Sequence, residues 1–397
     1  MQFAPFSISR LPRIIFGRGK INDVPSLAAN YGLNALIVTG KESFCASPRW
    51  LAFTQALEAK SLNWLQFTVS GEPSPALVDQ AVSQFRNEAI DVVIAIGGGS
   101  VLDAAKAIAG LLPHGNSVMD HLEGVGKNIA YTGPSTPFIA IPTTAGTGSE
   151  ATKNAVLSVQ GFDGFKKSFR DECLVPEYAV IDPDLLASCP AELMAADGMD
   201  AFTQLLESYV SIKANPFTDA LAWSGMNAVK EGFFAAWEGK EPEASQGRAS
   251  MAYAALLSGI TLAQVGLGSV HGLASPLGAY FPIPHGVVCG TLVAAATEIN
   301  IQAMQTREPN NPAQAKYAQV GRLLCGVQDL DDAAARSLLI GLLNHWSERL
   351  DLPRLKAYAI TQADFPRIIA DSRGSSMQTN PIKLTDAEIN AILVKRL

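Results

Sequence analysis

The strongest constraint on the fold is an apolar run, Val92 to Ile96, that ends in three glycines, Gly97 to Gly99. A strand that is apolar throughout is typical of a parallel sheet buried on both faces. Further apolar runs alternate with helix-like stretches. The strand-like runs are 35–39, 65–69 and 138–141, and the helix-like stretches are 50–59, 76–86 and 100–112. This alternation predicts a doubly wound, mostly parallel α/β sheet.

After Asp182-Pro183 the pattern changes to long Ala- and Leu-rich helical stretches with almost no strand signal. They cover 191–211, 216–237, 248–265 and 313–325, and polar loops are expected at 238–246 and 306–312. Because single cores stop growing at roughly 250–300 residues, a chain of 397 residues predicts two domains. We expect a nucleotide-binding α/β domain at 1–184 and an all-α, metal-binding domain at 185–397.

Composition excludes several classes of function. Charged residues make up only 17% of the chain and the net charge is −7, which disfavours a nucleic-acid partner because phosphate backbones need a basic surface. The five cysteines are scattered without a CxxC pair, as in reduced intracellular proteins. We find no signal-peptide pattern and no uninterrupted apolar run that would span a bilayer. A cytoplasmic enzyme with no membrane partner is therefore expected.

The glycines Gly97, Gly98 and Gly99 form a strand-to-helix turn that is suited to a phosphate. Exposed backbone N–H groups and a helix N-terminus attract anions. Ser100 is expected as the N-cap and Asp103 at the third helical position. The GxGxxG fingerprint is absent, so a plain turn is the alternative.

A second polar loop follows the predicted strand at 138–141. It contains Thr143, Thr144, Thr147 and Ser149. Because ligands of open α/β sheets bind beyond the carboxyl ends of the strands, both loops are expected to face one crevice. Together they predict a nucleotide cofactor.

The residues after the first strand bear on which nucleotide binds. An acidic residue near this position bonds the adenosine ribose and repels a 2′-phosphate. Here the chain has the small Gly40, the cationic Lys41 and the hydroxyl of Ser43, which favour NADP over NAD. Glu42 weakens this preference, so NAD stays possible.

Two distant segments carry residues that suit a divalent metal. Asp200 and Gln204 are four apart and share one face of a predicted helix, and His271 and His285 each precede a glycine. A carboxylate, an amide oxygen and two imidazoles form a plausible metal site. Cys289, four residues after His285, is interpreted as a buried apolar residue rather than a thiolate ligand.

With these motifs placed, the chain resembles the iron-containing (group III) alcohol dehydrogenase family. The resemblance runs from near Pro12 to the C-terminus. It rests on five segments: Gly97–Ala109, Ile141–Glu150, Asp182-Pro183, Gly198–Ser211 and His271–Gly286. It implies a dehydroquinate synthase-like two-domain architecture, with an α/β nucleotide domain, an all-α domain and a metal in the cleft. It implies NAD(P)-dependent exchange of a hydride with an alcohol or aldehyde.

Carried over by position, the resemblance implies that Asp200, Gln204, His271 and His285 hold Fe²⁺ or Zn²⁺. It places Gly97, Gly98, Gly99 and Ser100 at the pyrophosphate and Thr143, Thr144, Thr147 and Ser149 at the nicotinamide. Two residues depart from the family pattern: Gln204 stands where a histidine ligand is usual, and Ser275 where a histidine linked to activity is usual. We expect Asp200, His271, His285 and Ser275 to serve catalysis. The resemblance also implies a homodimer or higher homo-oligomer, through the segment around Phe6 to Phe16.

Two other functions stay open on the sequence. One is a dehydroquinate-synthase-like lyase or cyclase, which is disfavoured because the segment His271 to His285 offers no Lys or Arg for an acidic substrate. The other is a nucleotide-binding protein with a degenerate metal site, which Gln204 and Ser275 would explain. The two segments that carry the expected metal-binding residues are apolar, which favours a small neutral or weakly polar alcohol or aldehyde as the substrate.

Overall fold

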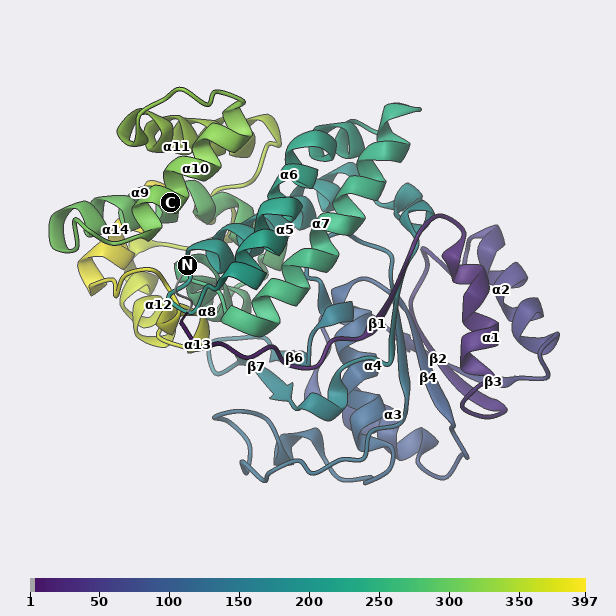
Figure 1. The fold of residues 1–397 in the computed structure, drawn as a ribbon. Coiled ribbons are helices and arrows are strands. Elements are labelled where there is room, and N and C mark those ends of the chain that lie inside the picture. The colour runs from purple at the N-terminus through teal and green to yellow at the C-terminus, as the bar shows by residue number, and fades with distance from the viewer. Residues whose placement is uncertain (1–3) are drawn as a thin grey trace.

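The computed structural model of the chain describes residues 4–397, in which an α/β domain is followed by an all-helical domain (Figure 1). Six parallel strands form the central sheet in the order β1-β8-β5-β4-β2-β3. Their bounds are β1 Arg13–Phe16, β2 Asn34–Gly40, β3 Asn63–Val69, β4 Val92–Gly97, β5 Phe138–Pro142 and β8 Tyr178–Ile181. Strand β4 lies inside the sheet between β2 and β5, so its terminal glycines open at the middle of the sheet edge.

Helices cover both faces of this sheet. They are α1 Val24–Ala28, α2 Pro48–Glu58, α3 Pro75–Phe85 and α4 Gly99–Leu111. On one face Ile94 of β4 packs in a cluster with Leu57 of α2, and on the other Ala95 packs in a cluster with α3 and α4. The doubly wound arrangement is confirmed. The four predicted strands and three predicted helices of this half lie within two residues of the observed ones.

Four strands have no counterpart among the predicted strand runs. Strands β1 and β8 are only four residues long, so they give little periodic signal. Strands β6 (Asn154–Val159) and β7 (Phe165–Arg170) form an antiparallel hairpin beside the main sheet. Two lysines interrupt the apolar pattern of β7. The hairpin packs β6 on α4 and β7 on helix α8 (Ser269–Tyr280), so it connects the two domains.

The C-terminal domain is helical in all its longer elements, as predicted. These are α5 Ala191–Val210, α6 Pro216–Glu238, α7 Glu243–Val265, α8 Ser269–Tyr280, α9 His285–Arg307, α10 Ala313–Cys325, α11 Asp332–Arg349, α12 Phe365–Asp371, α13 Ser375–Gln378 and α14 Asp386–Lys395. The prediction of a loop at 238–246 is wrong beyond Pro242, because helix α7 already begins at Glu243. The reason is that Ala244, in the first turn of α7, is fully buried in the core, which offsets the polar character of the segment.

Helix α9 is the central helix of this domain. By length and composition alone it is apolar enough to cross a membrane, but 89% of its most apolar window is buried inside the domain. The kinked pair α7–α8 passes the same test only if it is counted as one span bent by 100°. Core helices of globular domains commonly meet this criterion, so α9 is best explained by its burial.

Short 3-10 helices connect the longer elements. They are η1 Lys20–Asp23, η2 Val118–Asp120, η3 Ser149–Ala151, η4 Glu172–Leu174, η5 Pro183–Ser188, η6 Leu355–Tyr358 and η7 Gln362–Asp364. The domain boundary expected between residues 184 and 185 falls within η5. Leu185 of this helix packs with the sheet and Leu186 packs with the helical core. The boundary stays a prediction.

The N-terminal segment crosses between the domains. In Figure 1 the purple chain runs along the helical domain before it enters β1. There the backbone N–H of Ser9 donates to the Gln264 side chain of α7 at 2.7 Å. The segment therefore fastens the edge of the sheet to the helical domain.

Candidate functional site

Four potential metal-binding atoms meet between α5, α8 and α9. They belong to Asp200 of α5, His271 of α8, and His285 and Cys289 of α9, and all lie within 4.8 Å of one another. The Oδ1 atom of Asp200 is 3.1 Å from His271 Nε2 and 3.8 Å from His285 Nε2. The structure therefore brings together three of the four residues expected as ligands, from segments that are up to 85 positions apart (285 − 200).

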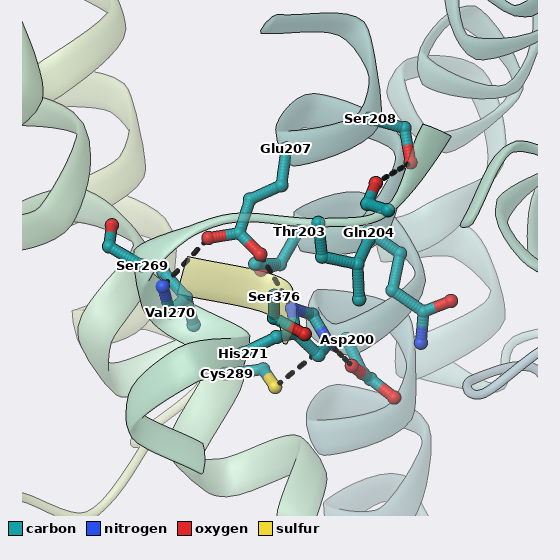
Figure 2. A network of polar contacts seen from close by, with 12 residues as sticks. Asp200, Thr203, Gln204, Glu207, Ser208, Ser269, Val270, His271, Cys289 and Ser376 are labelled. Atoms are coloured by element: carbon teal, nitrogen blue, oxygen red, sulfur yellow. Dashed lines mark hydrogen bonds and ion pairs between the residues drawn. The ribbon is translucent and has the colours of Figure 1, made fainter. Parts of the chain in front are cut away.

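The ring of His271 is held in one orientation. Its Nδ1 atom lies 2.7 Å from the Glu207 carboxylate, which accepts a hydrogen bond from it (Figure 2). Its Nε2 atom faces Asp200 Oδ1 at 3.1 Å. Burial alone would lower the pKa of His271, but Cys289, Asp200 and Glu207 outweigh it and raise this pKa well above its usual value, so a metal bound at Nε2 would displace a proton. A metal-binding histidine commonly has its second nitrogen fixed by a carboxylate in this way.

The donor set is incomplete without a cation. Asp200 is 1% exposed, yet its Oδ2 atom has no hydrogen-bond partner. Buried polar atoms without partners are rare, because each one loses its hydration without compensation. Burial alone would raise the pKa of Asp200, but His285 and His271 outweigh it and hold this pKa well below its usual range. An anionic carboxylate between two imidazoles fits a divalent cation.

His285 begins helix α9. Burial lowers its pKa to about 4 against the opposing charge of Asp200, so the ring is neutral at pH 7. Neutral imidazole is the form that binds metals. His285 is also the most accessible of the four, with its side chain 25% exposed, so a small molecule would reach the site on this side.

Gln204 lies one turn after Asp200 on α5, as expected, but its amide oxygen is already engaged. It accepts a hydrogen bond from Ser258 Oγ of α7 at 3.0 Å. In Figure 2 the amide lies on the side away from the Cys289 sulfur. Ser258 Oγ also lies 3.5 Å from the carbonyl of Gly146, in the polar loop after β5. Gln204 thus helps to connect α5, α7 and this loop.

Cys289 was not expected at this site. It is fully buried, and its sulfur lies 3.5 Å from His271 Nε2 and 3.8 Å from His285 Nε2. Burial raises the pKa of the free thiol to about 12. One signal in the sequence could have found it: Cys289 follows His285 by four residues, so the two side chains share a helix face.

Ser275 lies one turn after His271 on α8. Its hydroxyl donates to the backbone carbonyl of Lys166 at 3.1 Å. Lys166 belongs to the β6–β7 hairpin, and its ammonium pairs with Glu72 at 3.1 Å. The hairpin therefore brings a lysine to the cleft that the segment His271 to His285 does not contain. Its charge acts on His285, whose pKa it helps to lower.

The three glycines after β4 create space at the sheet edge. A Cβ atom at Gly97 would lie 2.6 Å from Val101, and one at Gly99 would lie 2.7 Å from Thr147 Oγ1. Helix α4 already begins at Gly99 with Gly98 as N-cap, because the Gly98 carbonyl accepts the first backbone bonds of the helix. The expectation that Ser100 caps this helix is therefore wrong, and Ser100 lies in its first turn.

The loop with Thr143, Thr144 and Thr147 lies directly against these glycines, as expected. The Thr143 N–H donates to the Gly97 carbonyl at 3.0 Å, and a Cβ at Gly98 would lie 3.3 Å from Thr144. The polar loops after β4 and β5 therefore lie side by side at the edge of the sheet. A cofactor phosphate and ring would find backbone donors and hydroxyls there.

The same loop also contacts the helical domain. Gly148 has φ of +61° and meets Gly259 of α7 so closely that a Cβ there would lie 2.4 Å from the Gly259 nitrogen. Next to it, a Cβ at Gly146 would lie 2.9 Å from the side chain of Asp197, which precedes Asp200 by one helical turn. The loop after β5 and the helix that carries Asp200 are thus neighbours.

Asp103 and Ser149 face the interior of the α/β domain. Ser149 Oγ donates to Asp103, and the second oxygen of Asp103 accepts the Val156 N–H at 3.1 Å. The fully buried Lys106 donates to the Ser149 carbonyl at 2.9 Å. The capping role expected for Asp103 is wrong, because its carboxylate fixes the loop and β6 instead of the helix start.

Gly40 ends β2, which pairs with β4 in the sheet, and Lys41 and Ser43 follow it. A Cβ at Gly40 would be in ordinary contact with Val101 of α4, at 3.8 Å. Lys41 is 72% exposed and only loosely paired with Glu42, at 3.9 Å. The expected 2′-phosphate contacts of Lys41 and Ser43 are therefore sterically open.

Comparison with known proteins accounts for both halves of the chain. Residues 12–183 match the family model described as iron-containing alcohol dehydrogenase. Residues 194–397 match the model for the C-terminal region of the Fe-containing alcohol dehydrogenase family.

Individual relatives agree over nearly the full length. The NAD-dependent methanol dehydrogenase of Bacillus methanolicus is 30% identical over 397 residues, covering 97% of this chain and 98% of its own. The NADPH-dependent butanol dehydrogenase of Clostridium saccharobutylicum is 29% identical over 401 residues, covering 96% of both. Among solved structures, a 1,3-propanediol oxidoreductase superposes with a TM-score of 0.89 at 27% identity, covering 99% of this chain and 100% of its own.

Proposed function

Because this chain belongs to the iron-containing alcohol dehydrogenase family, we propose that its particular reaction is the interconversion of a small alcohol and its aldehyde. The family assignment makes the chain an NAD(P)-dependent oxidoreductase with a divalent metal site. The single observation that carries the proposal is the convergence of Asp200, His271 and His285 beside the two polar loops. The fourth ligand is then either the Gln204 amide or the Cys289 thiolate.

The bound groups supply Lewis-acid polarisation of the substrate oxygen, by the cation, and hydride exchange, by the nicotinamide. The residues of the chain position the metal and the cofactor relative to each other. Helix α5 carries Asp200 to the metal and Asp197 to Gly146 of the polar loop. This single rigid element sets the distance between the reacting groups, and such positioning supplies much of the rate of a bimolecular reaction.

Several side chains are proposed to hold the cofactor. Backbone groups of the glycine turn would bind the pyrophosphate, and the hydroxyl loop would lie against the nicotinamide. The residues are Gly97, Gly98, Gly99 and Ser100 for the first and Thr143, Thr144 and Thr147 for the second, with Asp103 and Ser149 as their support. We propose NADP as the preferred cofactor, because Gly40, Lys41 and Ser43 leave room and charge for a 2′-phosphate.

We propose Ser275 as a relay for the proton that leaves or joins the substrate oxygen. It lies on α8 one turn from His271, and its hydroxyl now donates to the Lys166 carbonyl. In the relay the hydroxyl turns to the substrate oxygen, accepts its proton and passes its own proton to solvent water, and the reverse holds for reduction. The substrate is proposed to be small and neutral. Lys166 is the cation that reaches the cleft, and its pairing with Glu72 reduces its attraction for an acidic substrate.

Assembly is proposed to use the free edge of the sheet. Strand β1 is an edge strand, and Phe6, Ile14 and Phe16 are 50%, 40% and 41% exposed. Ile14 and Phe16 also line an apolar pocket of about 400 Å³ with Tyr253 of α7. An uncovered apolar edge favours pairing with a second copy. We expect Phe16→Lys to convert the homodimer to a monomer, as measured by light scattering on a sizing column. An unchanged mass would exclude this edge as the dimer interface.

A cytoplasmic location is proposed in keeping with five free cysteines.

The test of the reaction is stoichiometric consumption of NADPH with a panel of short aldehydes, before and after treatment with a chelator. Net consumption separates this function from that of a cyclase of the same architecture, which would use its cofactor only transiently. We expect one NADPH oxidised per aldehyde reduced, loss of turnover with the chelator, and recovery with added Zn²⁺ or Fe²⁺. Full turnover in the chelator-treated protein would contradict the metal-dependent reaction.

A further inference from the structure

Cys289 occupies the metal-binding cluster, whereas the amide oxygen of Gln204 is bonded elsewhere. Given the proposed metal site, on which this inference rests, the difference decides which side chain is the fourth ligand. Gln204 Oε1 accepts from Ser258, and its amide lies on the side away from the sulfur (Figure 2). The Cys289 sulfur lies 3.5 Å from His271 Nε2 and 3.8 Å from His285 Nε2, and the Asp200 carboxylate is within 4.8 Å of it.

Four of the six separations between these atoms are close to the edges of a metal tetrahedron. With metal–nitrogen and metal–oxygen bonds of about 2.0–2.1 Å and a metal–sulfur bond of about 2.3 Å, tetrahedral angles give edges of about 3.3 Å for N–O and about 3.6 Å for N–S. The N–O edges here are 3.1 and 3.8 Å. The N–S edges are 3.5 and 3.8 Å. Because all four atoms lie within 4.8 Å of one another, a single cation would reach them after side-chain shifts.

Hydrogen bonding alone leaves this cluster unsatisfied. His271 donates Nδ1–H to Glu207, and its Nε2 atom lies 3.1 Å from Asp200 Oδ1 and 3.5 Å from the Cys289 sulfur. The Oδ2 atom of Asp200, 1% exposed, has no partner. A cation bound to Asp200 would compensate this buried and partly unsatisfied carboxylate.

Helix α9 explains how a cysteine comes to this place. His285 and Cys289 are one turn apart, so both point to the same side of α9. Gly286 lets the start of this helix approach α5 closely, since a Cβ there would lie 2.6 Å from the Ala196 backbone. The close packing of α9 on α5 brings the sulfur next to Asp200.

We propose that Cys289 is the fourth metal ligand, completing an Asp200–His271–His285–Cys289 site that holds Zn²⁺ in preference to Fe²⁺. When the cation binds, the thiol proton leaves to solvent and one metal–sulfur bond forms, without change in oxidation state. Two anionic ligands then neutralise the dication in a buried site. Thiolate and imidazole together favour zinc, and zinc also lies above iron in the usual affinity order for divalent metals.

Cobalt provides the direct test, because Co²⁺ takes the same ligands as Zn²⁺ and a thiolate bond to it gives a charge-transfer band in the near ultraviolet. The full-length chain would be stripped of metal and titrated with CoCl₂ as wild type, Cys289→Ser and Gln204→Leu. We expect one Co²⁺ per wild-type chain with the band, loss of the band in Cys289→Ser, and its retention in Gln204→Leu. Zinc affinity should fall more in Cys289→Ser than the roughly 10- to 100-fold typical of an outer-shell partner.

Each other outcome decides against the proposal in a distinct way. One bound Co²⁺ without the band would exclude Cys289 while leaving the metal site of the proposed function. Loss of metal in Gln204→Leu, with Cys289→Ser unaffected, would assign the fourth ligand to Gln204. No bound metal in the wild type would overturn both the cysteine ligand and the metal-dependent reaction.

A second variant keeps the test decisive if Cys289→Ser does not fold. In it the remaining cysteines, Cys45, Cys173, Cys189 and Cys325, are replaced by serine and Cys289 is kept. A band that persists in this variant is due to Cys289 and supports the proposal. A band that disappears came from another cysteine and overturns it.

Discussion

The carboxylate of Glu207 bonds two groups of helix α8 at once. One oxygen lies 2.7 Å from His271 Nδ1, and the other accepts the backbone N–H of Val270 at 2.7 Å. Glu207 follows Asp200 by two turns of α5, so the helix that supplies the anionic ligand also orients an imidazole ligand. These two bonds to one carboxylate fix the orientation of the histidine ring.

Replacing Glu207 by glutamine removes one of these two acceptor atoms. The amide can accept from His271 or from Val270, but not from both, so the ring is held less firmly. We predict a roughly 10- to 100-fold loss of zinc affinity, measured by competition with a chromogenic chelator. Glu192→Gln, at an exposed position in the first turn of the same helix, is the matched control and should bind zinc as the wild type does.

Adding one methyl group at Gly99 tests the phosphate turn. Because the new Cβ would lie 2.7 Å from Thr147 Oγ1, Gly99→Ala forces the two polar loops apart. We predict that the KM for NADPH rises by roughly tenfold, about 1.4 kcal/mol of binding free energy. Gly341→Ala on α11 has no atom within 4 Å of its Cβ. That control should leave the KM unchanged and raise stability by about 0.5–1 kcal/mol. Equal effects of the two variants would argue against binding of the cofactor phosphate at this glycine turn.

A carboxylate at Gly40 should reverse the proposed cofactor preference. The position has room for a side chain, since a Cβ there would lie 3.8 Å from Val101. Gly40→Asp adds an acceptor for the ribose hydroxyls and repels the 2′-phosphate. We predict that kcat/KM for NADPH relative to NADH falls by roughly tenfold or more. Gly40→Ala adds bulk without charge and should change this ratio little. A wild-type enzyme that already prefers NADH would refute the NADP assignment.

Asp197 should make stability depend on pH. Burial and the neighbouring charge of Asp200 raise its pKa to about 7, despite a hydrogen bond from Thr144. An unfolded aspartate titrates near pH 4, so between about pH 4 and 7 the native state binds the extra proton. Stability from this group is complete below that window and is lost as the pH rises through it.

Asp197→Asn removes this titration. We predict that the free energy of unfolding of the wild type falls between pH 5 and 8 by roughly 1–3 kcal/mol more than that of the variant. Urea unfolding at both pH values measures the difference, in which the other titrating groups cancel. Parallel curves for the two proteins would show that Asp197 is ionised throughout.

Much of the fold follows from local sequence pattern. The buried strand Val92 to Ile96 and its glycine turn were predictable because apolar runs and glycine act within a few residues. The hairpin β6–β7 was not, since Lys166 and Lys167 interrupt its apolar period. These lysines are held by tertiary contacts, such as the pairing of Lys166 with Glu72, that no local window contains.

The metal cluster was predictable only in part. His271, His285 and Asp200 are of types and spacings that suggest ligands, and the structure brings them together. The neighbourhood of Cys289 depends on how closely α9 packs on α5, which the glycine at 286 permits but the sequence does not reveal. Likewise, the bond between Gln204 and Ser258 joins two helices whose relative rotation is set by the whole core.

Metal analysis of the protein purified without chelator is the most direct test of the account. Bound zinc and iron would be measured per chain in the wild type and in Asp200→Asn, which keeps the shape of the side chain but removes its charge. The account predicts close to one divalent cation per wild-type chain, with zinc in excess of iron, and only a small fraction of that in the variant. A metal-free wild type that still oxidises NADPH, or equal metal contents in the two proteins, would contradict it.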